Sequence, residues 1–218
     1  EPLTVYNYSY LGLNVDAALR DAVWTGPVTL ASGATLNVQL QGANTSSVTV
    51  VSTITGAGAI SKADAKLTLK LSGTNDYSGG TTLGSGALIL GSTTALGTGP
   101  VVLTSGLVDL NGNSAVIGSL SGGASSVIVD ASAGSGTTTL TVNQAVAGNM
   151  QGAISNGVAK TVAFIKTGNG ILTLSNTNTF AGPVTVSGGT LTVAVLPAIT
   201  NSSSIAVTSG GTLDINSL

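Results

Sequence analysis

The sequence predicts an all-β fold, a parallel β-helix (β-solenoid) of about nine or ten coils with a short capping strand and helix at its N-terminus. The first observation behind this prediction is internal repetition. LKLSGTNDYSGGTTLGSGALIL (69–90) aligns without gaps with LTLSNTNTFAGPVTVSGGTLTV (172–193). The second is a shorter phrase of strand, glycine and strand, which recurs at a nearly regular step, as at Gly79 and Gly99. The third is composition, because 31 glycines and abundant Val, Ile and Thr favour short strands that turn often.

The N-terminal residues differ in composition from the rest. They hold three of the four tyrosines, Tyr6, Tyr8 and Tyr10, and the single tryptophan, Trp24. The alternation in LTVYNYSYL predicts a strand with the three tyrosines on one face. The next segment, NVDAALRDAVW (14–24), predicts a helix, because polar residues suited to capping precede an apolar face.

This pattern divides the chain into an N-terminal cap or joining segment (1–24) and solenoid repeats (25–218), with long repeats near 56–120 and 157–218. Each coil is expected to point Val, Leu and Ile inward, onto like residues of the coils above and below. Thr, Ser and Asn then face water, and glycine forms the corners. At a strand spacing of about 4.8 Å, such a stack makes a rod roughly 45 Å long. A sandwich of antiparallel hairpins is the competing architecture.

Charge and composition exclude several classes of function. Charged residues make up 6% of the chain and its net charge is −2, so we expect no nucleic-acid partner. Lys62, Lys66 and Lys70 lie in and beside a strand pattern and are predicted to be solvated edge charges. No apolar run reaches the roughly 18 residues of a membrane-spanning helix, so the chain is not expected to span a membrane.

No constellation for catalysis, cofactor binding or metal binding is visible. The chain has no His and no Cys, and most acidic residues are scattered. Asp109 and Asp214 occupy equivalent repeat positions, too far apart for paired acid–base work, and are predicted to cap turns. Polysaccharide lyase activity is therefore disfavoured. Ice binding is disfavoured too, because no Thr-x-Thr phrase recurs at every coil.

Two stretches carry a family resemblance. Lys166-Thr-Gly-Asn-Gly170 with the following ILTLSNTNTF and SGGTLTV resembles the passenger-associated transport repeat of bacterial autotransporters, and the segment from Leu69 resembles it too. The resemblance implies a secreted, right-handed parallel β-helix that is extracellular or on the bacterial cell surface. In the first copy Lys62-Ala-Asp-Ala-Lys66 replaces the usual KxGxG, so its entry turn is expected to differ. The family's translocator is not recognised in the sequence, which suggests a fragment or a use of the repeats without it.

Matching positions of the motif suggest residue roles. Asn75 and Asn178 are expected to bond to turn backbone, and Tyr77 and Phe180 to pack over a corner. The main functional hypothesis is a non-catalytic stalk, fibre or filament subunit, stacked on further repeats of the same chain or end to end on copies of itself.

Two residue sets go with the functional hypotheses. Tyr6, Tyr8, Tyr10 and Trp24 are the candidate self-association residues, although they would equally cap their own solenoid. The alternative function is an adhesin for a glycan or host surface, with Tyr77 and Phe180 as candidate ligand contacts.

Overall fold

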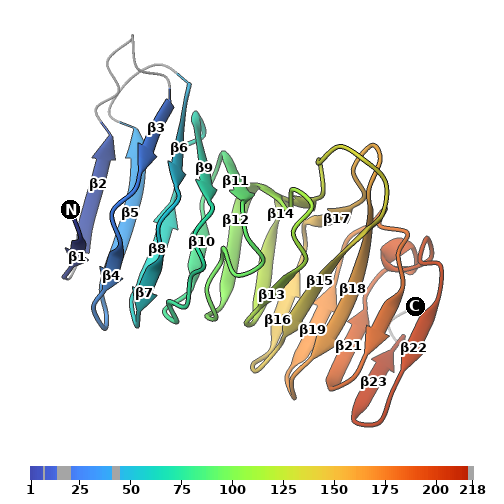
Figure 1. Cartoon of the computed structure of the whole chain (residues 1–218). Coiled ribbons are helices and arrows are strands. Elements are labelled where there is room, and N and C mark those ends of the chain that lie inside the picture. Colours follow the sequence, from blue (N-terminus) through green and yellow to red (C-terminus); the bar gives the residue numbers. More distant parts are fainter. Residues whose placement is uncertain (7, 14–20, 41–44, 216–218) are drawn as a thin grey trace.

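The computed structural model describes residues 1–6, 8–13, 21–40 and 45–215. These residues form a stack of short strands that advances steadily from the N-terminus to the C-terminus (Figure 1). Every strand pair in this part of the chain is parallel, and ten strands follow one another along the longest side, so the chain winds through about nine turns. The predicted parallel β-solenoid is therefore confirmed, and the antiparallel sandwich is excluded.

Each coil has up to three strands, which lie on three sides of the rod. The first side holds β1 (Leu3–Val5), β4 (Val28–Leu30), β7 (Ile54–Gly56), β13 (Ala115–Ile117), β15 (Thr137–Asn143), β18 (Thr161–Thr167), β20 (Val184–Val186) and β22 (Ile205–Val207). The second side holds β2 (Tyr8–Leu13), β5 (Thr35–Leu40), β8 (Ala59–Lys62), β10 (Thr81–Leu83), β12 (Val101–Asp109), β14 (Leu120–Val129), β16 (Gly148–Met150), β19 (Ile171–Leu174), β21 (Gly189–Val193) and β23 (Gly211–Asp214). The third side holds β3 (Asp21–Trp24), β6 (Ser46–Val50), β9 (Leu67–Leu71), β11 (Ala87–Leu90) and β17 (Ala153–Ser155), together with the C-terminal parts of β12 and β14.

The core is a set of columns in which like residues stack along the rod. Strands alternate buried and part-exposed positions, as in the pattern of β6 and β9. One column on the third side runs through six buried residues, one from each of six successive coils: Val48, Leu69, Leu88, Val108, Ile128 and Ile154. Burial of such side chains stabilises by about 1.5–3 kcal/mol each. The stacking of aliphatic residues predicted from the sequence is thus the observed core.

The N-terminal segment departs from the prediction. Asp21–Trp24, expected to end a helix, is strand β3 and pairs with β6. Residues 14–20, the rest of that expected helix, lie outside the described residues. β1, β2 and β3 pair in parallel with β4, β5 and β6, so they form a first coil. Alternate backbone groups of Asp21–Trp24 face the partner strand β6, and this pairing outweighs the weak helix preference of four residues.

Two further features differ from the simple repeat. The strand–glycine–strand phrase that begins at Gly99 forms one continuous nine-residue strand, β12, which bends from the second side to the third and has a register shift against β14 between Leu103 and Ser105. In the part of the chain that is described, the only helix is the three-residue 3₁₀ turn η1 (Leu196–Ala198), and none could span a membrane.

The two long repeats do not lie on the same sides of the rod. In the first repeat the lysine strand β8 is on the second side and leads to β9 on the third. In the second repeat the corresponding strand β18 is on the first side and leads to β19 on the second. The sequence repeat is therefore displaced around the rod by one side.

Candidate functional site

The asparagines of the two repeats act as buried cross-links between coils. Asn75 Oδ1 accepts a hydrogen bond from Ile54 N at 2.9 Å, and its Nδ2 donates to Ala95 O at 2.8 Å. Asn178 repeats the arrangement with Ile154 N at 2.8 Å and Ala198 O at 2.9 Å. Each side chain thus satisfies one N–H of the coil below and one C=O of the coil above, as the predicted bonding to turn backbone requires.

The aromatic residues of the same loops lie inside the rod. Tyr77 is 0% exposed and Phe180 is 1% exposed, so the expectation that they contact a ligand on the rod's side is wrong. The Tyr77 hydroxyl hydrogen-bonds to Thr81 Oγ1 at 2.5 Å, and burial raises the pKa of Tyr77 well above its usual range. Phe180 packs on Phe164 with ring centroids 6.0 Å apart. Their amphipathic or apolar rings fill space that the irregular loops would otherwise leave empty.

Two lysines, Lys62 and Lys166, are buried, although the sequence suggested that Lys62 faces solvent. Lys62 lies in an inward column between Val38 and Leu83 and is 1% exposed, so its prediction as a solvated edge charge is wrong. Its Nζ donates to Asp64 O and Ser85 O, each at 2.6 Å. Burial lowers the pKa of Lys62 to about 8, and Asp64 partly offsets this effect. The carbonyl groups compensate the charge in a region that excludes water.

The second repeat builds the same lysine turn. Lys166 Nζ donates to Thr167 O at 2.9 Å and to Gly168 O and Gly188 O at 2.8 Å, and burial lowers the pKa of Lys166. The turn after Lys62 was expected to differ because its sequence departs from KxGxG. The position of the ammonium is nevertheless the same, since backbone carbonyls rather than side chains receive it.

The acidic residues serve turns. Asp109 Oδ1 accepts hydrogen bonds from Asn111 N at 2.8 Å and Ala131 N at 2.9 Å, which confirms its predicted capping role. Asp130 is fully buried; burial would raise its pKa, but hydrogen bonds from Ser132 and Thr138 outweigh burial and hold the pKa below its usual value. Among the described residues, no three His, Cys, Asp or Glu side chains gather as a metal site.

The N-terminal aromatic residues lie on the first coils. Tyr6 is 68% exposed. Trp24 is partly buried against the core and donates from Nε1 to Gly26 O. The side chains of Tyr8 and Tyr10 are outside the described residues, although their backbone belongs to β2. The self-association role of these four residues stays a prediction.

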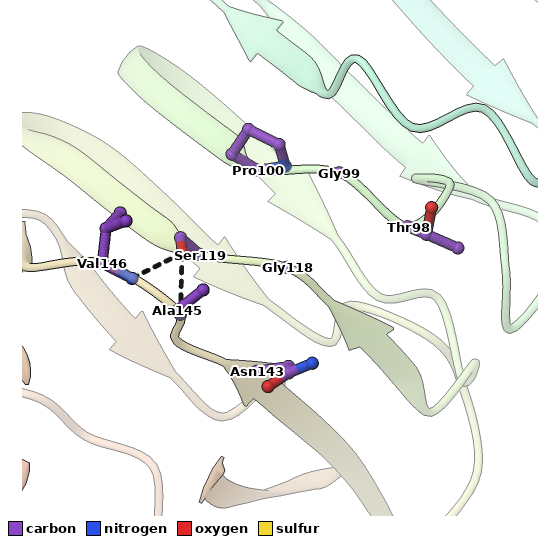
Figure 2. Close-up of a pocket in the computed structure, with 8 residues that line it drawn as sticks. All are labelled: Thr98, Gly99, Pro100, Gly118, Ser119, Asn143, Ala145 and Val146. Carbon is purple, nitrogen blue, oxygen red and sulfur yellow. Dashed lines mark hydrogen bonds between the residues drawn. The ribbon is translucent and has the colours of Figure 1, made fainter. Parts of the chain in front are cut away.

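A shallow groove follows one corner of the rod between the first and second sides (Figure 2). It is a hollow of about 330 Å³ lined by Thr98, Gly99, Pro100, Gly118, Ser119, Asn143, Ala145 and Val146. A second hollow of about 250 Å³ shares Thr98 and Asn143 with it and adds Val116. Both Val116 and Val146 are more than half exposed, at 63% and 64%.

Glycine and a change in coil length create this groove. A Cβ at Gly118 would meet Gly99 O at 2.6 Å, so the floor consists of closely stacked backbone. The next coil is longer and forms a wall, where Ser119 Oγ accepts hydrogen bonds from Ala145 N at 3.0 Å and Val146 N at 3.4 Å. The lining of the groove is mostly apolar, with a few hydroxyl and amide groups and no charged side chain, so the groove suits an uncharged ligand and offers no acid–base pair.

Sequence reasoning missed the groove and the buried lysines. The groove depends on coil length: Val101 pairs with Leu120 of the following coil, whereas Gly122, in the same strand as Leu120, pairs in its following coil with Met150, which is more distant along the chain. No residue type signals that change. For the lysines a signal exists, because Lys62 stands at an inward position of the alternating strand.

Comparison with known proteins bears on the repeats. The family model of the passenger-associated-transport-repeat matches residues 67–90 and 164–193. The chain is 33% identical over 143 residues to the adhesin BmaC autotransporter of Brucella suis biovar 1 (strain 1330), a match that covers 63% of this chain and 4% of that protein. This chain thus spans a small part of the relative's length, and no solved structure matches it. With parallel coils and two copies of the passenger-associated-transport-repeat, the chain is a β-solenoid similar to an autotransporter passenger, and this similarity places it outside the cell or at the cell surface.

Proposed function

We propose that this chain is a non-catalytic stalk segment, a rod that extends a surface passenger away from the cell or builds an extracellular fibre. The observation that carries the proposal is the unbroken ladder of ten parallel strands on the second side, from β2 to β23. Hydrogen bonds of the ladder run along the rod axis, and the side chains between coils interlock in columns. Both features suit a spacer that must keep its length under load.

The last described coil supports extension of the rod. Ile205 and Val207 continue the inward columns of Val184 and Val186. They are 46% and 48% exposed, whereas Val184 and Val186 are 0% exposed. An apolar column end with open strand edges can receive the first coil of a second copy.

Measurement of assembly against concentration tests the second-copy case. We expect rods that lengthen by end-to-end contact, seen by negative-stain imaging and light scattering, and shorter single rods for Val207→Lys. Val158→Lys is the matched control, because Val158 is 106% exposed on a loop away from the end. If Val207→Lys assembles like the wild-type chain, the column end is not the contact.

In the second-copy case, we propose that the first coil of one copy, with Tyr6, Tyr8 and Tyr10, contacts the last coil of the other copy. Substitution of Tyr6, Tyr8 and Tyr10 by serine is expected to abolish the polymer and to leave the β-rich circular dichroism spectrum unchanged. Unaltered fibres would reject the joining role of these tyrosines.

A second candidate function is adhesion, favoured by the name of the relative from Brucella suis. The groove at Thr98 and Asn143 is the surface that we propose for a glycan or other neutral ligand, in place of the buried aromatic residues. Beads coated with the chain are expected to bind glycans or host cells, and Val146→Asp is expected to weaken that binding. Val158→Asp again serves as the control, and equal loss in both variants, or no binding above background, would count against the groove.

A further inference from the structure

The chain contains three Asn-Gly pairs: Asn111–Gly112, Asn156–Gly157 and Asn169–Gly170. In such a pair the backbone nitrogen of glycine can attack the side-chain amide of the preceding asparagine, because glycine has no Cβ to hinder the approach. The three pairs have the same chemistry in an unfolded chain. Their surroundings in the folded rod differ in two respects that decide their reactivity.

The first difference is the attacking nitrogen. Gly112 N donates to Asp130 Oδ1 at 3.0 Å, and Gly170 N donates to Gln144 O at 2.7 Å. Both nitrogens are therefore held by the neighbouring coil. Gly157 N makes no hydrogen bond to any residue that the structure describes, so it is the nitrogen that can turn towards its own preceding side chain.

The second difference is the amide that would be attacked. Asn156 Oδ1 accepts hydrogen bonds from two backbone N–H groups, Val162 N at 2.8 Å and Ala181 N at 3.1 Å. Two such donors polarise the side-chain carbonyl and stabilise the negative charge that develops on Oδ1 when a nucleophile adds to Cγ. Among the bonds of the described residues, neither Asn111 nor Asn169 has such a pair of donors on Oδ1.

From this geometry we infer that Asn156 is a site of spontaneous self-modification, at which the rod converts an amide to a carboxylate. Gly157 N forms a bond to Cγ of Asn156 and loses its proton, and the Cγ–Nδ2 bond breaks with release of ammonia. The resulting succinimide then takes up one water, which opens the ring to aspartate or isoaspartate. Water is the only co-reactant, and each conversion adds one negative charge to the rod.

The aspartate product fits the site. The Asn156 Nδ2 group donates no hydrogen bond within the described chain and is not buried, so ammonia can leave to solvent and no donor is lost. An aspartate keeps both bonds from Val162 N and Ala181 N, and a charged acceptor strengthens them. Asn178 is the contrast, since its Nδ2 donates to Ala198 O and an aspartate there would place two acceptors together.

Peptide mapping by mass spectrometry tests the inference on the intact chain. The purified protein is incubated folded and, in parallel, unfolded in urea, and conversion at the three pairs is followed over time. We expect Asn156 to convert several-fold faster than Asn111 and Asn169 in the folded chain, and the three pairs to convert at similar rates in urea. A succinimide at Asn156 identifies the route. Folded-state conversion at Asn156 no faster than at the other two pairs would overturn the inference.

Two aspartate variants test the fit of the product. Asn156→Asp is expected to unfold at the same temperature as the wild-type chain or above it, whereas Asn178→Asp is expected to unfold at a lower one. A large loss of stability in Asn156→Asp would show that the site requires an amide and would refute the acceptor-only role.

Discussion

Replacement of Asn178 by alanine is expected to lower the free energy of unfolding by about 2–4 kcal/mol. The side chain is 2% exposed and holds Ile154 N at 2.8 Å and Ala198 O at 2.9 Å. Its removal leaves one buried donor and one buried acceptor without partners, at a cost of about 1–3 kcal/mol for each group, and rearrangement of the loop recovers part of the total.

Asn176 supplies the matched control. It lies two residues away in the same loop and also donates to a carbonyl of the coil below, Gln151 O at 2.8 Å, but its bond is exposed to water. Water replaces that bond when it is lost, so Asn176→Ala is expected to cost less than about 1 kcal/mol.

Urea unfolding, followed by circular dichroism, measures the loss in the overall free energy of unfolding. Hydrogen exchange at the Ile154 amide measures the loss of local stability. Both measurements are needed because the coils of a solenoid can open separately. We expect the Ile154 amide to exchange much faster in Asn178→Ala and at the wild-type rate in Asn176→Ala. Equal losses in both variants, or a change within about 0.5 kcal/mol in Asn178→Ala, would refute the cross-link argument.

Three further predictions concern the lysine turns and the glycine corner. Lys166→Met removes a donor to three carbonyls and should lower stability by about 2–4 kcal/mol, whereas Lys70→Met, on an outward position, should stay within about 0.5 kcal/mol in the same urea assay. Because burial lowers the pKa of Lys62 from 10.5 to about 8, the unfolded chain binds more protons than the folded chain between these values. The free energy of unfolding should therefore rise with pH across that range, and it should rise less in the Lys62→Met variant. A fall in the free energy of unfolding of the wild-type chain across the same range would contradict the lowered pKa of Lys62. Gly118→Ala should cost about 1–3 kcal/mol, since its Cβ meets backbone at 2.6 Å. Gly84→Ala, whose nearest contact is a side chain at 3.0 Å, should cost less, and the reverse order would show that the corner backbone yields easily.

The sequence carried enough information for the architecture. Alternation within strands and glycine phrases at a nearly regular step predict parallel stacking, because that step brings like aliphatic residues into one column, as in Leu69 and Leu88. The same repetition predicted the roles of Asn75 and Asn178. The asparagine of the motif hydrogen-bonds backbone N–H and C=O groups of the adjacent coils, and the same groups need a partner in each of the two copies.

The rest of the site depends on contacts between coils that differ from one coil to the next. Sequence reasoning puts Tyr77 and Phe180 at the surface, although an irregular loop leaves room inside the rod for a ring. It also puts Lys62 at the surface, because it gives the charge of the side chain more weight than its inward position in the alternating strand. It assigns Asp21–Trp24 to a helix, because the pairing with β6 is a long-range contact that local preference does not contain.

The displacement of the second repeat by one side has a geometric consequence. The lysine turn and the asparagine loop of the second copy therefore face a different direction from those of the first copy, because the second copy is rotated about the rod axis by one side. If many copies followed one another with the same rotation, their lysine turns and asparagine loops would be distributed around the rod. A cell or molecule that approached the rod from any side would then meet the same kind of corner.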